Sequence, residues 1–200
     1  MGRPREHSDE TRTRVLQVAS RLLADEGVTG VSVRRVADEA GTTTRAIYTL
    51  FGGKEGLLKQ LFRDAAQTMT RYHEAVPQQD DPVAEILALA DAYRRAALEH
   101  PHGYDLLLNG APGFVPDQED ARVAQRSFAR VLAAFERWAE DGRIGGRDPR
   151  MIALEMWALV HGLASFELAG RLGSRRRATQ RWRDAVGNAV SGFVSQEGDK

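Results

Sequence analysis

The chain has 200 residues, with 28 Lys and Arg, 28 Asp and Glu, and no formal net charge. A hydrophobic content of 42% suits a core organised as one domain or two small ones. Because Cys is absent, disulfides, cysteine zinc sites and thiol redox sensing are excluded. We find no signal-peptide pattern and no apolar run long enough to span a bilayer, so we expect a cytoplasmic protein with no membrane partner.

The first sixty residues are only slightly basic, with ten Lys and Arg against eight Asp and Glu. This charge balance argues against binding to nucleic acid through bulk charge, so the local placement of cations must supply any contact. Ser8 or Asp9 can cap a first long helix, which Gly27 ends. Arg3 and Arg5 precede that helix, and they are either an arm that reaches DNA or part of a solvated terminus.

Residues 32–54 predict two short helices joined by a tight turn. Ser32 is a good N-cap for the first helix, and Gly41 suits the left-handed position that ends it. The apolar positions at helical spacing are Val33, Val36, Ala37 and Ala40 in the first helix, and Ala46, Ile47 and Leu50 in the second. This is the helix-turn-helix pattern, in which the second helix enters the DNA major groove. A helical hairpin in an ordinary bundle would share the cap and the Gly stop.

A specific combination of residues occurs in and around this motif: Leu22-Leu23, Gly27, Ala40-Gly41, Thr44-Arg45-Ala46-Ile47-Tyr48, Phe51, Lys54-Glu55 and Leu57-Leu58. In these residues the chain resembles the N-terminal domain of the TetR/AcrR family of transcription regulators. The resemblance covers about residues 9–62 and departs from the family at Gly52-Gly53, where a Ser or similar cap is more usual. It implies an all-α protein with a three-helix DNA-binding domain at residues 1–54, followed by a helical effector-binding and dimerisation domain at residues 55–200.

The outward positions of the motif are the candidate DNA contacts. Arg45 can pair bidentately with guanine, a contact worth about 1–3 kcal/mol of discrimination. The positive charge of Lys54 is unfavourable at a helix start, because the helix dipole is positive there. A nearby phosphate would explain this placement, and the family commonly uses this Lys to contact phosphate. The threonines either bond to DNA or only cap the helix. Arg34 and Arg35 are both candidate contacts to the DNA backbone, and the alternative is that one of the two is only a surface charge. The full predicted set is Arg3, Arg5, Ser32, Arg34, Thr42, Thr43, Thr44, Arg45, Tyr48 and Lys54.

Further helices are expected after the motif, and no strand-like alternation of useful length is found. Their approximate ranges are 54–76, 82–100, 121–141, 151–172 and 174–195, with a short apolar piece at 104–108. The range 151–172 is apolar nearly all round, which indicates burial on several sides. Because little chain remains to cover the last two helices, we expect a homodimer. The residues predicted for its interface are Leu159, Leu163, Trp182, Val186, Val190 and Phe193.

The segment with Trp157, His161 and Gly162 resembles the Trp-His-Gly class of ligand-binding domain. That resemblance implies a homodimer through the last two helices and an effector cavity in each C-terminal domain. The candidate pocket residues are Tyr93, Tyr104, Phe128, Trp157, His161 and Phe166. Each of these aromatic residues either lines the cavity or packs in the core, and His161 is either a hydrogen-bonded core residue or a ligand contact.

A basic run near the last helix contains Arg171, Arg175, Arg176, Arg177, Arg181 and Arg183. It is either a solvated loop or a site for an acidic effector or a partner across the dimer. The pair His100 and His102 is a weak metal-site pattern, so no metal and no other cofactor is expected. No phosphate-binding loop or catalytic spacing is found, and we do not expect an enzyme.

These patterns together predict a ligand-responsive transcription regulator, in this family most often a repressor. Its partners would be a palindromic double-stranded DNA operator, a second copy of the chain and a small-molecule effector. The alternative is a helical protein-interaction module that kept the fold without specific DNA binding.

Overall fold

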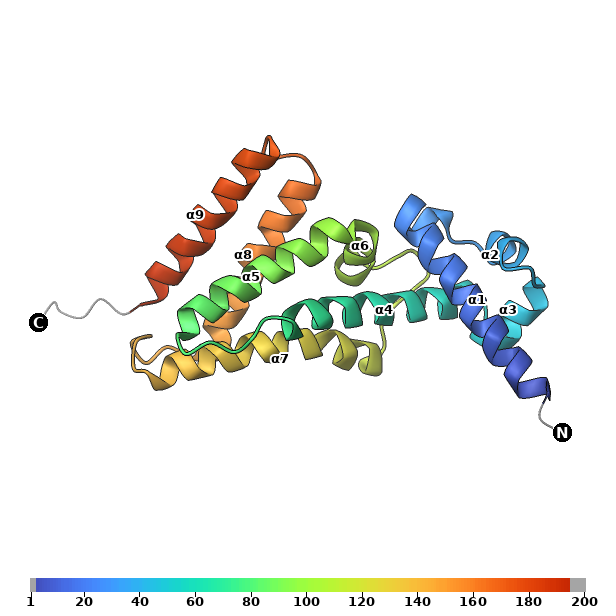
Figure 1. Cartoon of the computed structure of the whole chain (residues 1–200), viewed down its shortest axis with the longest axis horizontal. Coiled ribbons are helices and arrows are strands. Elements are labelled where there is room, and N and C mark those ends of the chain that lie inside the picture. The colour runs from blue at the N-terminus through green and yellow to red at the C-terminus, as the bar shows by residue number, and fades with distance from the viewer. Residues whose placement is uncertain (1–2, 195–200) are drawn as a thin grey trace, which may run out of the picture. The chain divides into compact units, whose positions relative to one another are not determined.

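The computed structural model describes the backbone of residues 3–194 and the side chains of residues 8–194 (Figure 1). Over this range the chain is all-helical, as predicted, with nine α-helices, one 3-10 helix and no strand. The helices are α1 (Arg3–Glu26), η1 (Val28–Gly30), α2 (Val33–Glu39), α3 (Thr44–Phe51), α4 (Lys54–Glu74), α5 (Pro82–Glu99), α6 (Pro101–Asn109), α7 (Gln118–Glu140), α8 (Pro149–Leu168) and α9 (Arg175–Phe193).

Two helix starts differ from the sequence predictions. The first helix begins at Arg3, so that Ser8 and Asp9 lie inside α1 and do not cap it. Cap residues favour a helix start without requiring one, and the helix continues through them toward the N-terminus. Helix α6 begins at Pro101, where proline fills the first helical position because its missing N–H has no partner to lose there.

The chain divides into two compact units. The N-terminal unit comprises Met1–Thr68 and His100–Ala124, and the C-terminal unit comprises Met69–Glu99 and Gln125–Lys200. This physical division differs from the functional boundary predicted after Lys54, because the first half of α4 packs into the N-terminal core. The functional boundary itself stays a prediction.

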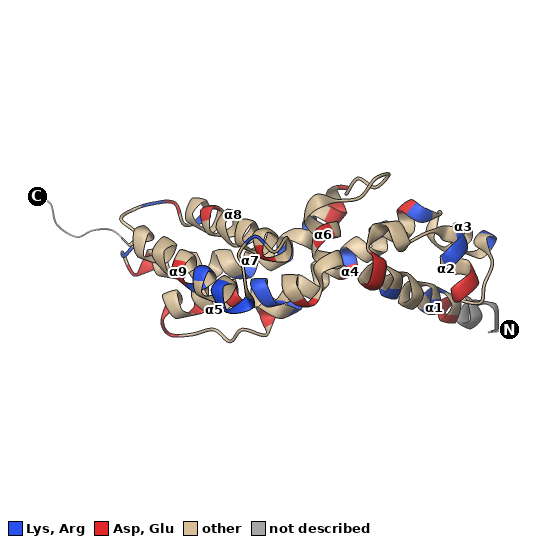
Figure 2. Cartoon of the chain, turned by 90° about the horizontal axis from the view of Figure 1, so that it is seen from above, with Lys and Arg blue, Asp and Glu red and all other residues tan. Residues whose placement is uncertain are grey.

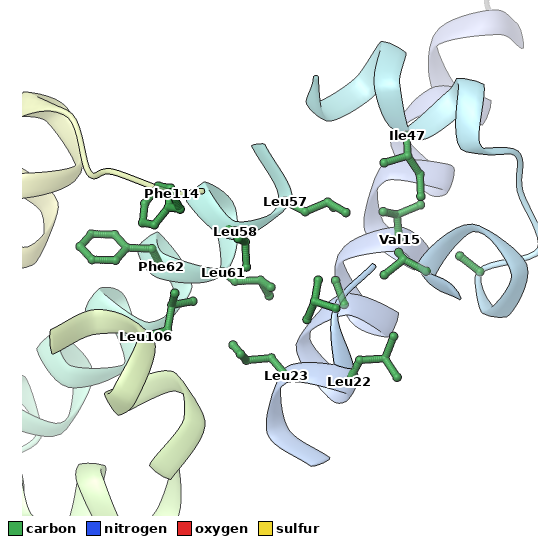
Figure 3. Close-up of a cluster of buried hydrophobic side chains, with 14 of the residues drawn as sticks. Val15, Leu22, Leu23, Ile47, Leu57, Leu58, Leu61, Phe62, Leu106 and Phe114 are labelled. Atoms are coloured by element: carbon green, nitrogen blue, oxygen red, sulfur yellow. The ribbon is translucent and has the colours of Figure 1, made fainter. Parts of the chain in front are cut away.

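One hydrophobic cluster holds the N-terminal unit together (Figure 3). Its members come from α1, α2, α3, α4, α6 and the loop after α6, and Val15, Ile47 and Leu57 are fully buried. Burying each such side chain contributes about 1.5–3 kcal/mol to folding. The full cluster is Val15, Ala19, Leu22, Leu23, Val31, Val36, Ala37, Ala40, Ile47, Leu57, Leu58, Leu61, Phe62, Leu106 and Phe114.

The C-terminal unit combines an apolar core with buried ion pairs. Its largest fully buried side chains include Phe135, Trp138 and Trp182. Glu85 is also fully buried, and it is held by Arg130 and Arg137 of α7. A buried carboxylate needs such partners, because leaving it unpaired away from water would be strongly destabilising.

The last two helices are covered differently from the sequence prediction. Trp182, Val186, Val190 and Phe193 of α9 are buried within the chain itself, with exposed fractions of 8% or less. Their predicted place at a dimer interface stays a prediction. Helix α8, expected to be buried on several sides, instead leaves five large apolar side chains exposed: Met151, Leu154, Trp157, Phe166 and Leu168.

Helix α8 is also the one described helix that is long and apolar enough to cross a membrane. This is weak evidence, because the core helix of a soluble protein meets the same test of length and composition. The expected absence of a membrane partner stays a prediction.

A close approach between the end of α3 and the start of α4 requires glycine at position 56. A Cβ at Gly56 would overlap the backbone carbonyl oxygen of Phe51. We expect Gly56→Ala to lower the free energy of unfolding by about 1–3 kcal/mol, because the two helices must move apart. Chemical denaturation measures this change. The matched control is Gly103→Ala in α6, where the new Cβ would meet only Ala65 at an ordinary 3.5 Å; equal effects would contradict the close-packing argument.

Candidate nucleic-acid interface

The turn between α2 and α3 is fixed by backbone and cap hydrogen bonds. The Ser32 hydroxyl accepts a hydrogen bond from the Arg35 backbone N–H at 3.3 Å, which caps α2. After α2, Gly41 has a φ of 62°, and the N–H of Thr42 donates to the carbonyl of Ala37 at 3.0 Å. This pattern satisfies the last carbonyls of the helix and reverses the chain, as the sequence predicted for Gly41.

Helix α3 is held by a cap, a buried anchor and a glycine stop. The Thr43 hydroxyl accepts a hydrogen bond from the Ala46 N–H at 3.1 Å, and Ile47 is fully buried in the cluster of the N-terminal unit. Gly52 ends the helix in the left-handed conformation. With Ile47 turned inward, the exposed face of α3 carries Thr44, Arg45, Tyr48 and Thr49.

The Tyr48 ring lies against Gly53 and not in the core. Its side chain is 60% exposed, and a Cβ at Gly53 would come within 2.9 Å of the ring. The paired glycines that depart from the family pattern therefore have a structural use here. Gly52 supplies a left-handed turn, and Gly53 leaves room for the ring beside the start of α4.

Arg12 of α1 fixes the far end of α3, a role that the sequence did not indicate. Its guanidinium donates to the Leu50 carbonyl at 3.0 Å and lies 4.7 Å from the centre of the Phe51 ring. Arg12 and Leu50 are 38 residues apart in the sequence, and no local pattern predicts their contact. It satisfies a carbonyl at the C-terminus of α3 and adds a favourable charge there.

The adjacent arginines of α2 have different environments. Arg35 donates hydrogen bonds to both carboxylate oxygens of Glu26 at 2.6 Å and to Glu39 at 2.9 Å. The hydrogen bonds to Glu26, and then those to Glu39, raise the pKa of Arg35 above its usual value. The Arg34 side chain is 91% exposed, with only Asp38 within reach at 4.0 Å. Arg34 is thus available to a phosphate, whereas Arg35 links α1 to α2.

Arg45 of α3 and Lys54 of α4 are further cations of the motif. Figure 2 marks the positions of Lys and Arg and of Asp and Glu along the ribbon, and both signs of charge occur around α1, α2 and α3. The side chains of Arg45 and Lys54 are exposed, and neither forms an ion pair with any side chain in the range 8–194. Thr43 and Thr44 are exposed beside them, while Ser32 and Thr42 are half-buried. The side chains of Arg3 and Arg5 lie outside the described residues, so their predicted role is not placed.

The six candidate effector residues do not form one group. Tyr104 belongs to the N-terminal unit, while the other five belong to the C-terminal unit. Tyr93 is buried, and its hydroxyl lies 3.5 Å from Nδ1 of His161, whose ring stacks on Trp157. Desolvation lowers the pKa of His161. Phe128 is half-buried, and Phe166 is half-exposed.

Two family models match this architecture. Residues 15–61 match the bacterial regulatory proteins of the tetR family, and residues 86–197 match the Tetracyclin repressor-like C-terminal domain. The second match alone covers more than half of the chain. The chain belongs to the TetR family. It is a DNA-binding transcription regulator.

Individual proteins support the assignment. The HTH-type transcriptional regulator Mb1846 of Mycobacterium bovis is 26% identical, with 87% of each chain covered. The tetracycline repressor protein class C of Escherichia coli is 31% identical over 58% of this chain and 52% of its own. A structure of a protein with unknown function from Rhodococcus sp. RHA1 superposes with a TM-score of 0.81 at 26% identity, covering 92% of this chain and 96% of that one.

The two adjacent arginines give a test of the interface. We expect Arg34→Ala to weaken binding to a duplex of arbitrary sequence and to reduce the salt dependence of that binding by about one phosphate contact. Arg35→Ala should leave the salt dependence unchanged and lower the free energy of unfolding slightly, as expected for a partly exposed ion pair. Fluorescence anisotropy at several salt concentrations and urea denaturation measure the two effects. The same loss of DNA binding in both variants would contradict the assignment.

Proposed function

We propose that this TetR-family regulator is a cytoplasmic repressor that binds a palindromic operator as a homodimer and is released by a small-molecule effector. The observation that carries the proposal is the exposed face of α3, whose Arg45 has no partner in the described part of the protein. A face held by caps on a buried anchor, with a free guanidinium, is suited to a fixed contact in the major groove. Membership of the Trp-His-Gly class, carried by Trp157, His161 and Gly162, remains part of this proposal.

The contacts divide into base readout and phosphate positioning. Arg45 reads a base. Thr43 and Thr44 support it from the start of α3, and Tyr48 supports it from the middle of the helix. Arg34 and Lys54 bind phosphate, because each is an exposed cation at or near a helix N-terminus, where anions are also favoured by the backbone. Ser32 and Thr42 act mainly by shaping the turn, and their backbone N–H groups also serve to shape it.

Replacement of Arg45 tests the reading role. We expect Arg45→Ala to weaken binding to the DNA that flanks the protein's own gene by about 1–3 kcal/mol, because a bidentate base contact is lost. Binding to random DNA should fall much less, and the melting temperature should not change. The matched control is Arg126→Ala, which removes an exposed arginine from α7. If the intact protein bound flanking and random DNA equally at every salt concentration, the interaction-module alternative would replace the regulator.

The homodimer is proposed to form through the exposed apolar face of α8. TetR-family regulators typically bind DNA as dimers, and large contiguous apolar patches are uncommon on monomeric proteins. Leu159 and Leu163, two of the residues predicted for the interface, are half-buried on this helix. The face itself is formed by Met151, Leu154, Trp157, Phe166 and Leu168. A two-fold axis would bring the same face of each protomer together.

A charge on this face should separate the protomers. We expect Leu154→Glu to convert the dimer to a monomer at micromolar concentration, because two carboxylates would be buried near the symmetry axis. Sedimentation velocity measures the mass, and operator affinity should fall with it. The control is Val115→Glu, at a loop position where the side chain is already 82% exposed. A Leu154→Glu variant that remains dimeric would move the interface elsewhere.

A further inference from the structure

A pocket of about 870 Å³ lies in the C-terminal unit, between the chain that follows α4 and helices α5, α8 and α9. Its volume is within the range of about 300–1,000 Å³ that small-molecule sites occupy. None of the six aromatic residues predicted for the effector site lines it. The lining residues are Ala75, Val76, Pro77, Ala88, Asp91, Arg94, Arg95, Leu98, Glu99, Glu167, Arg175, Thr179 and Arg183.

Helical spacing explains how this wall is built. On α9, Arg175, Thr179 and Arg183 are four residues apart and share one face, which adjoins the buried face of that helix. These two arginines belong to the basic run whose role the sequence left open. On α5, Arg95 and Leu98 face the same pocket from the opposite side.

Part of the charge in the pocket is already neutralised. Arg94 donates to the two carboxylate oxygens of Glu167 at 2.7 Å and to the Thr179 hydroxyl at 2.9 Å. Both members of this pair are largely buried, with side chains 14% and 9% exposed. The carboxylate of Glu99 accepts a hydrogen bond from the Tyr72 hydroxyl. Arg94 and Glu167 therefore hold each other in place, and Glu99 already accepts a hydrogen bond.

The remaining charges favour an anion. Arg95, Arg175 and Arg183 are exposed to the pocket, and none of them forms an ion pair with a side chain of residues 8–194. Asp91 and Glu99 are the remaining carboxylates of the lining, since the neutral Tyr72 hydroxyl leaves the charge of Glu99 in place. Three guanidiniums facing two carboxylates leave an excess of one positive charge, and guanidinium groups bind carboxylates through paired hydrogen bonds.

The other part of the lining is apolar. Ala75, Val76 and Pro77 follow α4, while Ala88 and Leu98 come from α5. Contact between this surface and the hydrocarbon part of a ligand is favourable, because apolar area is removed from water. The surface offers the ligand no polar group to bind. The pocket thus combines a cationic wall with an apolar one.

We propose that this pocket binds a small organic acid, with its carboxylate on Arg95, Arg175 and Arg183 and its hydrocarbon body on the residues after α4 and on α5. The inference deepens the proposed function, on which its regulatory part rests: the acid is the effector class. The same segment, Ala75–Pro77, directly continues the helix that begins at Lys54, so the ligand touches the end of a helix that starts at a predicted DNA contact.

Calorimetry on the full-length protein without DNA tests the binding. The probes are decanoate and 1-naphthoate, compared with the neutral 1-decanol and 1-naphthalenemethanol and with the decyltrimethylammonium cation. At physiological salt we expect each acid to bind at least about tenfold more tightly than its neutral counterpart, because charge-assisted hydrogen bonds are added. The cation should bind most weakly. Absence of binding by both acids, or equal affinity for acids and alcohols, would overturn the proposal.

Paired variants locate the site. The double replacement Arg95→Ala with Arg183→Ala should weaken acid binding at least about tenfold, because two hydrogen-bonding cations are lost. Its melting temperature should stay unchanged, since neither side chain has an ion-pair partner among the described residues. The control, Arg126→Ala with Arg176→Ala, removes two exposed arginines that do not line the pocket. A double variant that keeps its affinity, or a control that loses it, would place the acid elsewhere.

Operator binding separates this inference from the function on which it rests. Acid binding that leaves operator affinity unchanged would support the pocket and sink its role as the effector site. Operator binding by a protein that takes up neither acid would leave the DNA-binding function standing and reject the organic-acid pocket.

Discussion

The burial of Ile47 is the constraint on which the exposed face of α3 depends. Helix α3 has eight residues, too few to be stable in isolation, so its geometry must come from its surroundings. Ile47 anchors one side of the helix in the core, Thr43 caps its start, and Gly52 ends it. Arg12 then holds the last carbonyls from α1. A rigid exposed face follows from these few contacts, because any rotation of α3 would withdraw Ile47 from the cluster.

The same unit separates structural charges from available ones. Arg35, Arg21, Glu26 and Glu39 form a network that joins α1 to α2. Lys59 and Arg63 of α4 similarly hold Asp117 and the buried Asp120 at the start of α7, and the hydrogen bond from Lys59 lowers the pKa of Asp117. Among the exposed cations of the motif, Arg45 and Lys54 have no ion-pair partner in the range 8–194. A nearly neutral protein can thus present a local positive surface without a basic composition.

Local features of this fold could be predicted from the sequence, and long-range ones could not. The caps at Ser32 and Thr43 and the stop at Gly41 depend on neighbours within a few residues, and each was found where its residue type favours it. The partners of Arg12 and Arg35 depend on chain segments brought together only by folding. Helices α8 and α9 show the limit of sequence-based prediction most clearly. Both carry apolar stripes, but packing in the folded chain decides which stripe is buried. For the same reason, the run of arginines in the sequence could not predict that Arg175 and Arg183 line one pocket together with α5.

The three tryptophans of the C-terminal unit differ in solvent exposure, and fluorescence can measure this difference. Trp138 and Trp182 are enclosed in the protein interior, whereas Trp157 is 40% exposed on the apolar face of α8. Water-accessible quenchers would therefore reach one indole and spare the other two. The native sequence already carries an optical label at the surface proposed for self-association, together with two internal references.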